Sequence, residues 1–166
     1  MTATLTRADA EDLLYREALL LDTGRFADWL ALFTADVEFW MPAWRDETTT
    51  TQDPDSELSL IYYKGRRNLE DRVMRLTSGL SVASAPLPRV VHQVTNVLVL
   101  EAADGVAEVS AAFTCHRHDV RMNRSDCFFG RYLYRVVDEG GSWRIARKVV
   151  TLLNDTIPTV VDINSI

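Results

Sequence analysis

Three histidines are the first residues to consider, because imidazole serves both as a metal ligand and as a general acid or base. His116 and His118 lie two residues apart in the stretch CHRHD, so on a strand both side chains point to one face. Two imidazoles and a carboxylate form the facial triad of non-haem iron enzymes, which makes this spacing a candidate for the start of a metal site. A polar face near the end of a strand is the simpler explanation, since ligand type without geometry is weak evidence.

The third histidine, His92, lies in the stretch RVVHQVTNV. A curved sheet could bring it together with Tyr15 and Asp36, and a buried histidine–carboxylate pair would suit dehydration or isomerisation. The alternative is a hydrogen-bonded histidine in the core or at an interface. We favour this alternative, because one sequence gives no pocket geometry.

Other chemical motifs are missing. A Rieske cluster needs two cysteines and two histidines; Cys115 adjoins His116, but Cys127 has no histidine near it. Both cysteines lie in apolar strand patterns, which predicts small buried side chains and no disulfide framework. The sequence has no glycine-rich phosphate loop, nucleophile elbow or CxxC motif. The histidines discussed above therefore remain the candidates for chemistry at this point.

Composition narrows the classes of function. The 166 residues are 47% hydrophobic and 25% charged, which is typical of one globular domain, here residues 1–166. The net charge of −6 argues against nucleic-acid binding, because phosphate contacts need clustered lysine and arginine. No apolar run approaches the roughly 18 residues that span a bilayer. The first residues turn acidic before any apolar stretch, unlike a signal peptide, so we expect a cytoplasmic protein that binds no membrane.

Two helices are predicted at the start of the chain. Thr6 and Asp9 form a capping pair ahead of a helix at about residues 8–23. Gly24 offers the left-handed conformation that ends a helix at low cost. A second helix is predicted from apolar residues at helical spacing, namely Phe26, Trp29, Leu30 and Phe33.

Short elements follow in the middle of the chain. Residues 36–41 alternate as a strand, which Pro42 ends because it cannot donate a ladder hydrogen bond. Residues 45–57 and 78–88 are predicted loops, and residues 58–63 a short strand. A third helix is capped by Asn68 and turns one apolar face to the core, namely Leu69, Val73 and Leu76.

The second half of the chain is predicted to be a sheet. The four β segments span residues 89–101, 106–120, 126–138 and 142–153. The turns between them are Asp104-Gly105, Met122-Asn123-Arg124 and Glu139-Gly140-Gly141. Turns of two or three residues force neighbouring strands to be antiparallel, so these strands form a meander. Helices followed by an antiparallel sheet indicate the α+β class, with the curved sheet wrapped around the N-terminal helices.

Two apolar features point to a partner. The ending NDTIPTVVDINSI stays apolar at Ile157, Val160, Val161, Ile163 and Ile166. We expect this segment to lie along the domain or against another subunit, and favour the second. Trp40 and Trp44 flank Pro42, and alternation turns Trp40 away from Val37 and Phe39.

Exposed tryptophans are frequent interface anchors, so the corner at residues 40–44 is a candidate contact surface. Alanine at either tryptophan should then weaken assembly more than the isolated fold. The alternative is that the following loop folds over both side chains.

Long stretches of the chain resemble one family. From about Asp12 to the end, four stretches resemble the small (β) subunits of aromatic-ring-hydroxylating dioxygenases in order and spacing. They are LLYREALLLDTGRFADWLALFTADVEFWMPAW, DPDSELSLIYYKGRRNLEDRVMRL, RVVHQVTNVLVL and KVVTLLNDTIPTVVDINSI. Within the family, FWMPAW, NLEDRV and the LLND ending are most similar to the benzoate, toluate and anthranilate dioxygenases.

This resemblance implies a fold and a function. The fold is an NTF2-like (cystatin-like) cone, with N-terminal helices packed in a strongly curved, mostly antiparallel sheet. The function is that of a non-catalytic structural small subunit of a Rieske non-haem iron dioxygenase, which cis-dihydroxylates a benzoate-like aromatic carboxylic acid in aromatic catabolism. The resemblance further implies a large (α) subunit that carries the Rieske [2Fe–2S] cluster and mononuclear Fe(II). It therefore implies no catalytic, cofactor-binding or metal-binding residue in this chain. Three large and three small subunits would assemble, and a reductase would supply electrons from NADH.

Two other functions remain open at this point. One is a free-standing NTF2-like dehydratase or isomerase that uses His92 with a carboxylate. It predicts an open polar pocket inside the cone, whereas a subunit can fill its cone with side chains. The other is a small ligand-binding domain.

Overall fold

The structure is a computed structural model that describes residues 4–79 and 86–166. Part of the loop predicted at residues 78–88 therefore lies outside the described residues. The elements in chain order are α1 (Arg7–Asp22), α2 (Phe26–Leu30), β1 (Phe33–Pro42), β2 (Ser59–Lys64), α3 (Arg66–Thr77), β3 (Arg89–Ala103), β4 (Val106–Asp119), β5 (Arg124–Asp138), β6 (Trp143–Leu152) and the short 3₁₀ helix η2 (Ile163–Ser165).

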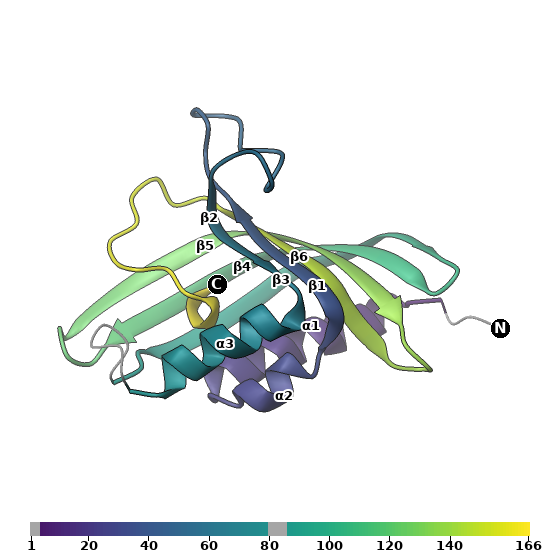
Figure 1. The fold of residues 1–166 in the computed structure, drawn as a ribbon, viewed down its shortest axis with the longest axis horizontal. Helices are drawn as coiled ribbons and strands as arrows, with labels where there is room; N and C mark the ends of the chain where they lie inside the picture. Colours follow the sequence, from purple (N-terminus) through teal and green to yellow (C-terminus); the bar gives the residue numbers. More distant parts are fainter. Residues whose placement is uncertain (1–3, 80–85) are drawn as a thin grey trace.

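The described strands form one open six-stranded sheet in the order β2-β1-β6-β5-β4-β3. Strands β3 to β6 form the predicted antiparallel meander, whereas β1 pairs parallel with β6 and antiparallel with β2. The register shifts between Thr95 and Leu98 of β3, where Asn96 has a φ of 55°. Such a bulge bends a strand and increases its twist. The sheet therefore curves, and Figure 1 shows the three α helices together on its concave side.

Helix α1 begins with the predicted capping pair. The Asp9 backbone N–H donates to the Thr6 hydroxyl at 3.2 Å, and the Thr6 backbone N–H donates to the Asp9 carboxylate at 3.0 Å. This reciprocal arrangement satisfies two N–H groups that the first turn of a helix leaves unpaired. One face of α1 then packs against the sheet, namely Ala10, Leu13, Leu14, Glu17, Ala18, Leu20 and Leu21.

Helix α2 is shorter than predicted. It ends at Leu30, and Phe33 is the first residue of β1. The helical spacing of Phe33 from Phe26 therefore wrongly predicted a helix that extends to residue 33. Phe33 instead pairs with Ile145 of β6 and is buried, so a tertiary contact with a distant strand sets the boundary. Pro42 ends β1 as predicted.

Helix α3 starts two residues before the predicted cap. Its N-cap is Gly65, with a φ of 85°, a left-handed conformation that glycine adopts without steric cost. The Asn68 side chain donates to the Lys64 carbonyl at 2.6 Å and caps no helix. The predicted apolar face is nevertheless correct, because Leu69 and Leu76 are buried and Val73 packs against the core.

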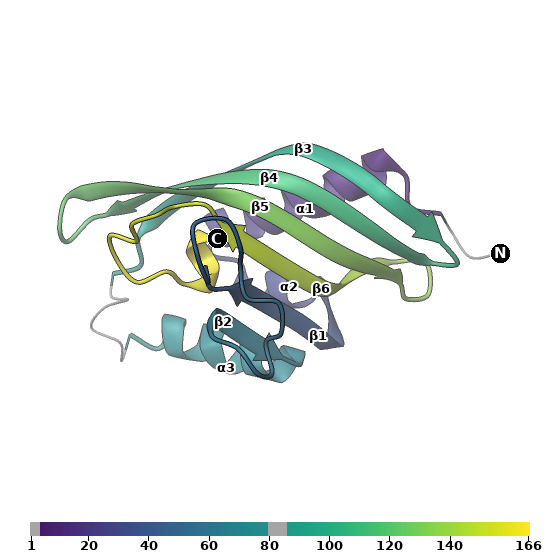
Figure 2. The same ribbon diagram turned by 90° about the horizontal axis from the view of Figure 1, so that it is seen from above.

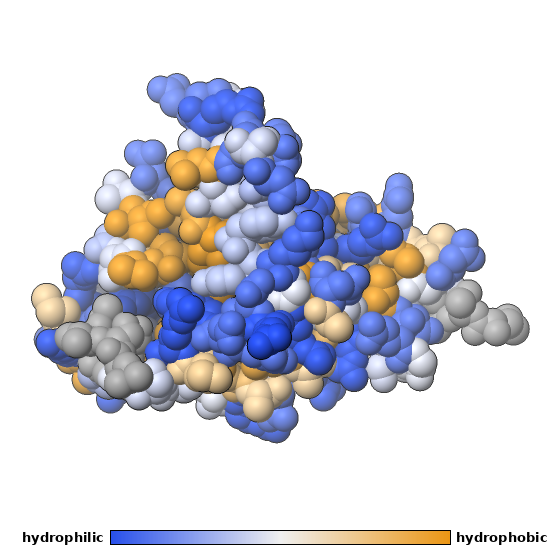
Figure 3. Space-filling model, in the orientation of Figure 1, coloured by the Kyte–Doolittle hydropathy of each residue, from blue (hydrophilic) through white to orange (hydrophobic). Residues whose placement is uncertain are grey.

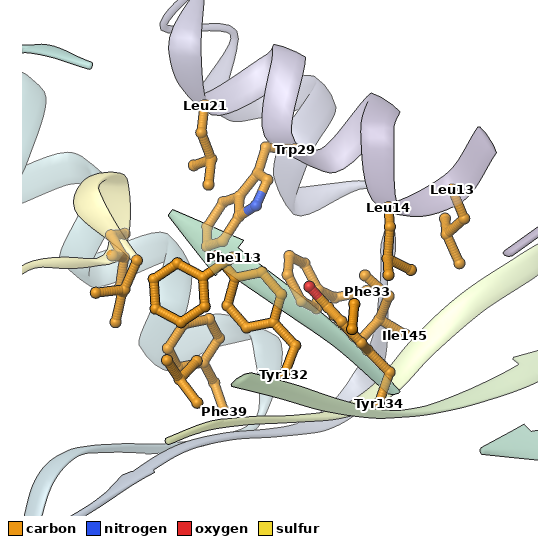
Figure 4. Close-up of a cluster of buried hydrophobic side chains, with 14 of the residues drawn as sticks. Leu13, Leu14, Leu21, Trp29, Phe33, Phe39, Phe113, Tyr132, Tyr134 and Ile145 are labelled. Carbon is orange, nitrogen blue, oxygen red and sulfur yellow. The ribbon is translucent and has the colours of Figure 1, made fainter. Parts of the chain in front are cut away.

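Rings from four elements fill the space between the helices and the sheet. Figure 4 shows Trp29, Phe33, Phe113, Tyr132 and Tyr134 pointing toward one another. The Phe113 and Tyr132 rings are stacked with centroids 4.2 Å apart, and Trp29 meets Phe33 edge to face at 4.8 Å. Aromatic pairs in these geometries stabilise a core beyond the area that they bury.

Candidate functional site

A buried ion pair between Glu17 of α1 and Lys148 of β6 lies in the interior of the cone. Their side chains are 3% and 1% exposed, and Lys148 Nζ lies 2.8 Å from Glu17 Oε1. The Tyr134 hydroxyl donates to Glu17 Oε2 at 2.7 Å, and Trp29 Nε1 donates to Oε1 at 3.4 Å. One carboxylate therefore joins α1 and α2 to β5 and β6.

Aromatic rings enclose the ammonium group of this pair. Lys148 Nζ lies 4.4 Å from the ring centroid of Tyr132 and 5.4 Å from that of Phe39, within the range of a cation–π attraction. Burial raises the pKa of Tyr132 and of Tyr134 well above the usual value, and the Glu17 carboxylate raises both further. Both phenols therefore stay protonated, and Tyr134 remains a donor to Glu17.

The sequence prediction did not include Glu17 or Lys148. A signal existed for each, because Glu17 lies within the apolar stripe of α1, between Leu14 and Leu21. Lys148 likewise points inward on β6, as Ile145 does. Charged residues are almost never fully buried unless they are paired, so two of them in core positions indicate a pair. Only the fold shows that they meet each other.

His92 of β3 is tied to Asp22, the last residue of α1. His92 Nδ1 lies 2.6 Å from Asp22 Oδ1, and the His92 backbone N–H donates to the same carboxylate at 3.0 Å. The prediction of a hydrogen-bonded core histidine is thus confirmed. Its Nε2 is buried and has no hydrogen-bond partner in the described part of the chain, so the ring is enclosed and not presented to a substrate.

Tyr15 and Asp36 do not converge with His92, so the less favoured alternative from the sequence was wrong. Tyr15 is 47% exposed, and Asp36 accepts a hydrogen bond from the Thr34 hydroxyl at 2.8 Å. The carboxylate beside His92 comes instead from the end of α1. Nothing in the local pattern distinguishes Asp22 from an ordinary residue at a helix end, so the sequence could not identify this pair.

The C-terminal segment closes the mouth of the cone. Ile163, Asn164, Ser165 and Ile166 are 0–4% exposed. The Asp162 carboxylate caps η2 and accepts from Arg72 of α3 through both oxygens. Figure 1 shows η2 beside α3. The favoured prediction, that this ending lies against another subunit, was wrong for residues 162–166, which dock into their own chain.

The residues just before this segment remain on the surface. Ile157 is 39% exposed and Val160 is 67% exposed, and Figure 3 shows apolar surface gathered where the C-terminal segment lies. A cavity of about 150 Å³ remains beneath it, lined in part by Arg72, Arg117, Asp119 and Asp162. Each arginine there is paired with an aspartate, so the cavity offers no net positive charge to an anion.

His116 and His118 lie on the outer face of the sheet, away from the helices. His116 is exposed opposite Cys127, and His118 Nδ1 lies 2.9 Å from the Ser125 hydroxyl. Residues 4–79 and 86–166 contain no group of three or more His, Cys, Asp and Glu side chains that could hold a metal ion. The two histidines share a polar strand face, as the simpler interpretation predicts.

The two cysteines differ in burial. Cys115 is fully buried, whereas Cys127 is exposed, so the prediction of a buried side chain was wrong for Cys127. The reason is strand parity, because Cys127 neighbours His116 on the outer face. Burial first, and the Asp22 carboxylate second, raise the pKa of the Cys115 thiol to about 12.

This difference predicts selective modification of one cysteine. Thiol reagents react with the thiolate, so the folded protein at pH 8 should lose one thiol, that of Cys127, while Cys115 stays unmodified until the protein unfolds. Peptide mass spectrometry after brief alkylation measures this. The Cys127→Ser variant is the control and should show almost no labelling; rapid labelling of Cys115 in that variant would contradict the prediction.

Trp40 and Trp44 also differ in burial. Register places Trp40 on the outer face, but it is only 5% exposed, because its Nε1 donates to the Ser59 hydroxyl at 2.9 Å and Arg147 lies over its ring. The predicted exposure of Trp40 was wrong. Trp44 is 39% exposed and donates to the Leu152 carbonyl at 2.8 Å.

These contacts change the expected effects of the two alanine substitutions. Trp40→Ala should lower the free energy of unfolding by about 2–3 kcal/mol, the value of burying a large apolar side chain. Trp44→Ala should cost less, about 1–2 kcal/mol, because it removes one hydrogen bond and a ring that is only partly buried. Urea denaturation of the isolated subunit measures both; equal losses would contradict this ranking.

Comparison with known proteins agrees with this geometry. The model of the family described as ring hydroxylating beta subunit matches residues 16–159. The chain is 38% identical to toluate 1,2-dioxygenase subunit beta of Pseudomonas putida, over 96% of this chain and 98% of that one. It is 37% identical to benzoate 1,2-dioxygenase subunit beta of Acinetobacter baylyi, over 96% and 94%.

Solved structures show the same fold. The beta subunit of benzoate 1,2-dioxygenase from Burkholderia mallei superposes with a TM-score of 0.83 at 33% identity, covering 99% of this chain and 100% of that one. A hexachlorocyclohexane dehydrochlorinase shares the fold at a TM-score of 0.64 and 15% identity, covering 89% and 85%. The predicted NTF2-like cone is confirmed, although its sheet remains open.

No helix among the described residues is long and apolar enough to cross a membrane. The family model covers most of the chain, and relatives above 30% identity match it nearly end to end. The enclosed interior of the cone is consistent with a subunit that fills its core with side chains. The chain therefore belongs to the family of ring-hydroxylating dioxygenase beta subunits.

Proposed function

We propose that this chain is the structural small subunit of a dioxygenase that cis-dihydroxylates a benzoate-like aromatic carboxylic acid. One observation carries the proposal: the chain matches, over most of its length, small subunits of toluate, 2-halobenzoate, benzoate and anthranilate dioxygenases at 37–39% identity. All four of these relatives are named for aromatic carboxylic acids. The subunit acts as one domain in the cytoplasm.

The partner of this subunit is a large subunit that carries the metal centres. We assign to it the Rieske [2Fe–2S] cluster and the mononuclear Fe(II), with NADH-derived electrons supplied by a reductase. The cysteines and histidines of the described residues do not fit the Rieske cluster, because Cys115 points inward while the adjacent His116 points outward. A Rieske cluster needs two cysteines and two histidines around one pair of irons. No step of the reaction is therefore assigned to this chain.

The contribution of this chain is a rigid surface for assembly, with three small and three large subunits in the complex. The Glu17–Lys148 pair and the Asp22–His92 contact fix α1 to both halves of the sheet. A helix fixed at two points along its length holds the sheet in one curvature. Large subunits that contact such a sheet are held in one relative orientation.

The free-standing dehydratase is the weaker candidate. It requires a histidine–carboxylate pair that faces an open polar pocket. The pair exists, but His92 is 8% exposed and the central charged pair is surrounded by aromatic rings. Chemistry on a bound substrate needs a reacting atom within hydrogen-bond reach of the base, and these side chains leave no such access.

Co-expression tests the proposal. The large-subunit gene from the same genome is expressed with an affinity tag, with and without this chain. We expect the two chains to purify together in constant ratio and to convert benzoate to a cis-diol when a reductase and NADH are added. Persistent failure to co-purify would overturn the proposal, and dehydratase activity of the isolated chain would favour the alternative.

A further inference from the structure

Residues 155–166 run from the end of β6 to η2, and we call them the C-terminal strap. Figure 2 shows this segment leaving the sheet as a loop and returning to η2. Asn154, just before the strap, is fixed to β5. Its side-chain amide donates to the Cys127 carbonyl at 2.9 Å, and its side-chain oxygen accepts from the Phe129 N–H at 2.9 Å. The strap therefore starts from a fixed point.

The first part of the strap has few contacts with the rest of the chain. Arg124 donates to the Pro158 carbonyl at 3.0 Å, and the part of the chain that the structure describes shows no other hydrogen bond of residues 155–161. Ile157 is 39% exposed and Val160 is 67% exposed. Segments with few buried contacts and exposed backbone open at a lower free energy than the core does.

The far end of the strap is held by one ion pair and by apolar burial. Arg72 of α3 donates to both oxygens of Asp162, and these side chains are 28% and 11% exposed. Ile163 and Ile166 are fully buried. The hydrogen bonds of η2 join strap residues to one another, as from the Ser165 N–H to the Asp162 carbonyl at 2.9 Å. Helix η2 can therefore move away from the cone without losing its own hydrogen bonds.

Few interactions must break for the strap to move. Among the described residues, Arg72 and Arg124 are the only ones outside the strap that hydrogen-bond to it. No described strand pairs with the strap. By contrast, β4 pairs with β5 without interruption from Val106 to Asp119. The sheet can therefore stay paired while the strap is released.

We propose that the C-terminal strap opens as one unit while the sheet stays folded, with the Arg72–Asp162 pair as its latch. Opening breaks the two arginine contacts and exposes Ile163 and Ile166. It also uncovers the mouth of the cone and joins to solvent the cavity of about 150 Å³ beneath the strap. Strap opening concerns this chain alone, so it goes beyond the proposed function and does not depend on it.

Hydrogen exchange of the full chain, measured for each residue by NMR at several low urea concentrations, tests this opening. The amides of Asp162, Ile163 and Ser165 report on the strap, and those of β4 and β5 report on the sheet. The three strap amides should share one protection factor, at least about tenfold below that of the sheet. Their exchange should depend little on urea, because a local opening exposes little surface.

Two results in the wild-type chain would overturn the proposal. One is a strap whose protection and urea dependence equal those of the sheet, because the strap would then open only when the whole chain unfolds. The other is a different protection factor for each of the three amides, which would mean that the end of the chain frays one residue at a time.

Val109→Ala separates strap opening from unfolding of the whole chain. Val109 is fully buried in β4 and does not line the cavity. The closed and open forms both contain the sheet, so the strap amides should exchange at the wild-type rate. The sheet amides should exchange at least about tenfold faster, because the loss of buried methyl groups destabilises the folded sheet. Equal acceleration of both sets of amides would contradict separate opening.

Arg72→Gln tests the latch, because it removes the guanidinium but leaves Asp162 to cap η2. The strap amides should exchange about tenfold faster, as expected when charge-assisted hydrogen bonds are lost. Glu70→Gln is the matched control: it removes the exposed Arg66–Glu70 pair on the same helix and should leave the strap rate unchanged. An unchanged rate in Arg72→Gln, or an equal increase in Glu70→Gln, would overturn the latch. If Arg72→Gln folds poorly, the wild-type chain and Val109→Ala still decide whether the strap opens by itself.

Discussion

Glu17→Ala is expected to lower the free energy of unfolding by about 3–5 kcal/mol, the cost of leaving one partner of a buried ion pair without the other. Lys148, which is 1% exposed, would lose the carboxylate that pairs with it. The Tyr134 hydroxyl and the Trp29 indole N–H would lose the same acceptor. Three buried donors would therefore lack partners, and each carries a desolvation cost.

Chemical denaturation with circular dichroism measures this loss. Glu11→Ala is the matched control on the same helix, because Glu11 forms an exposed ion pair with Arg7, and such pairs contribute about 0–1 kcal/mol. The double variant Glu17→Gln with Lys148→Met should recover part of the loss, since replacing both charges removes the unpaired one. A loss below about 1 kcal/mol in Glu17→Ala would contradict the assigned role of the pair.

Ending the chain after Val161 is the second change with a large expected effect. The deleted Ile163 and Ile166 are fully buried, and each is worth about 1.5–3 kcal/mol of stability. The deletion also removes the carboxylate that binds Arg72. We expect a loss of about 3–6 kcal/mol from the two isoleucines, and exposure of the apolar lining of the cone.

Two measurements keep this prediction testable if the truncated chain folds poorly. Ile163→Ala retains the full length and should lower stability by about 2–5 kcal/mol. An apolar fluorescent dye, which binds exposed core surface, should bind the truncated chain more strongly than the full chain. Val160→Ala, at a side chain that is 67% exposed, is the control and should change neither. Unchanged stability of Ile163→Ala would mean that the segment does not contribute to the core.

Both predictions concern the interior, yet they bear on assembly. The Glu17–Lys148 pair holds α1 against β6, and the C-terminal segment holds α3 against the mouth of the cone. If either contact is lost, the curvature of the sheet is less well determined. A complex with the large subunit should then form less completely, although neither change lies on the outer face of the sheet.

Local sequence patterns were enough to identify most helices and strands and the α+β class. Helical spacing located the apolar side of α3, and the Thr6–Asp9 pair marked the start of α1 correctly. Short turns required β3 to β6 to be antiparallel neighbours, because a two- or three-residue turn allows no other arrangement. These features depend on residues close together in the chain, so a local pattern contains them. The chain-long resemblance likewise identified the family.

Contacts between residues far apart in the sequence could not be predicted from local patterns. Phe33 lies on a strand because it pairs with Ile145 of β6, and Glu17 of α1 forms an ion pair with Lys148 of β6. His92 is held by Asp22, a residue that no local pattern distinguishes. Alternation placed Trp40 on the outer face correctly but could not show that its neighbours cover it. The periodicity of a sequence pattern indicates the direction in which a side chain points. Its burial and its partners depend on which other parts of the chain pack on that side.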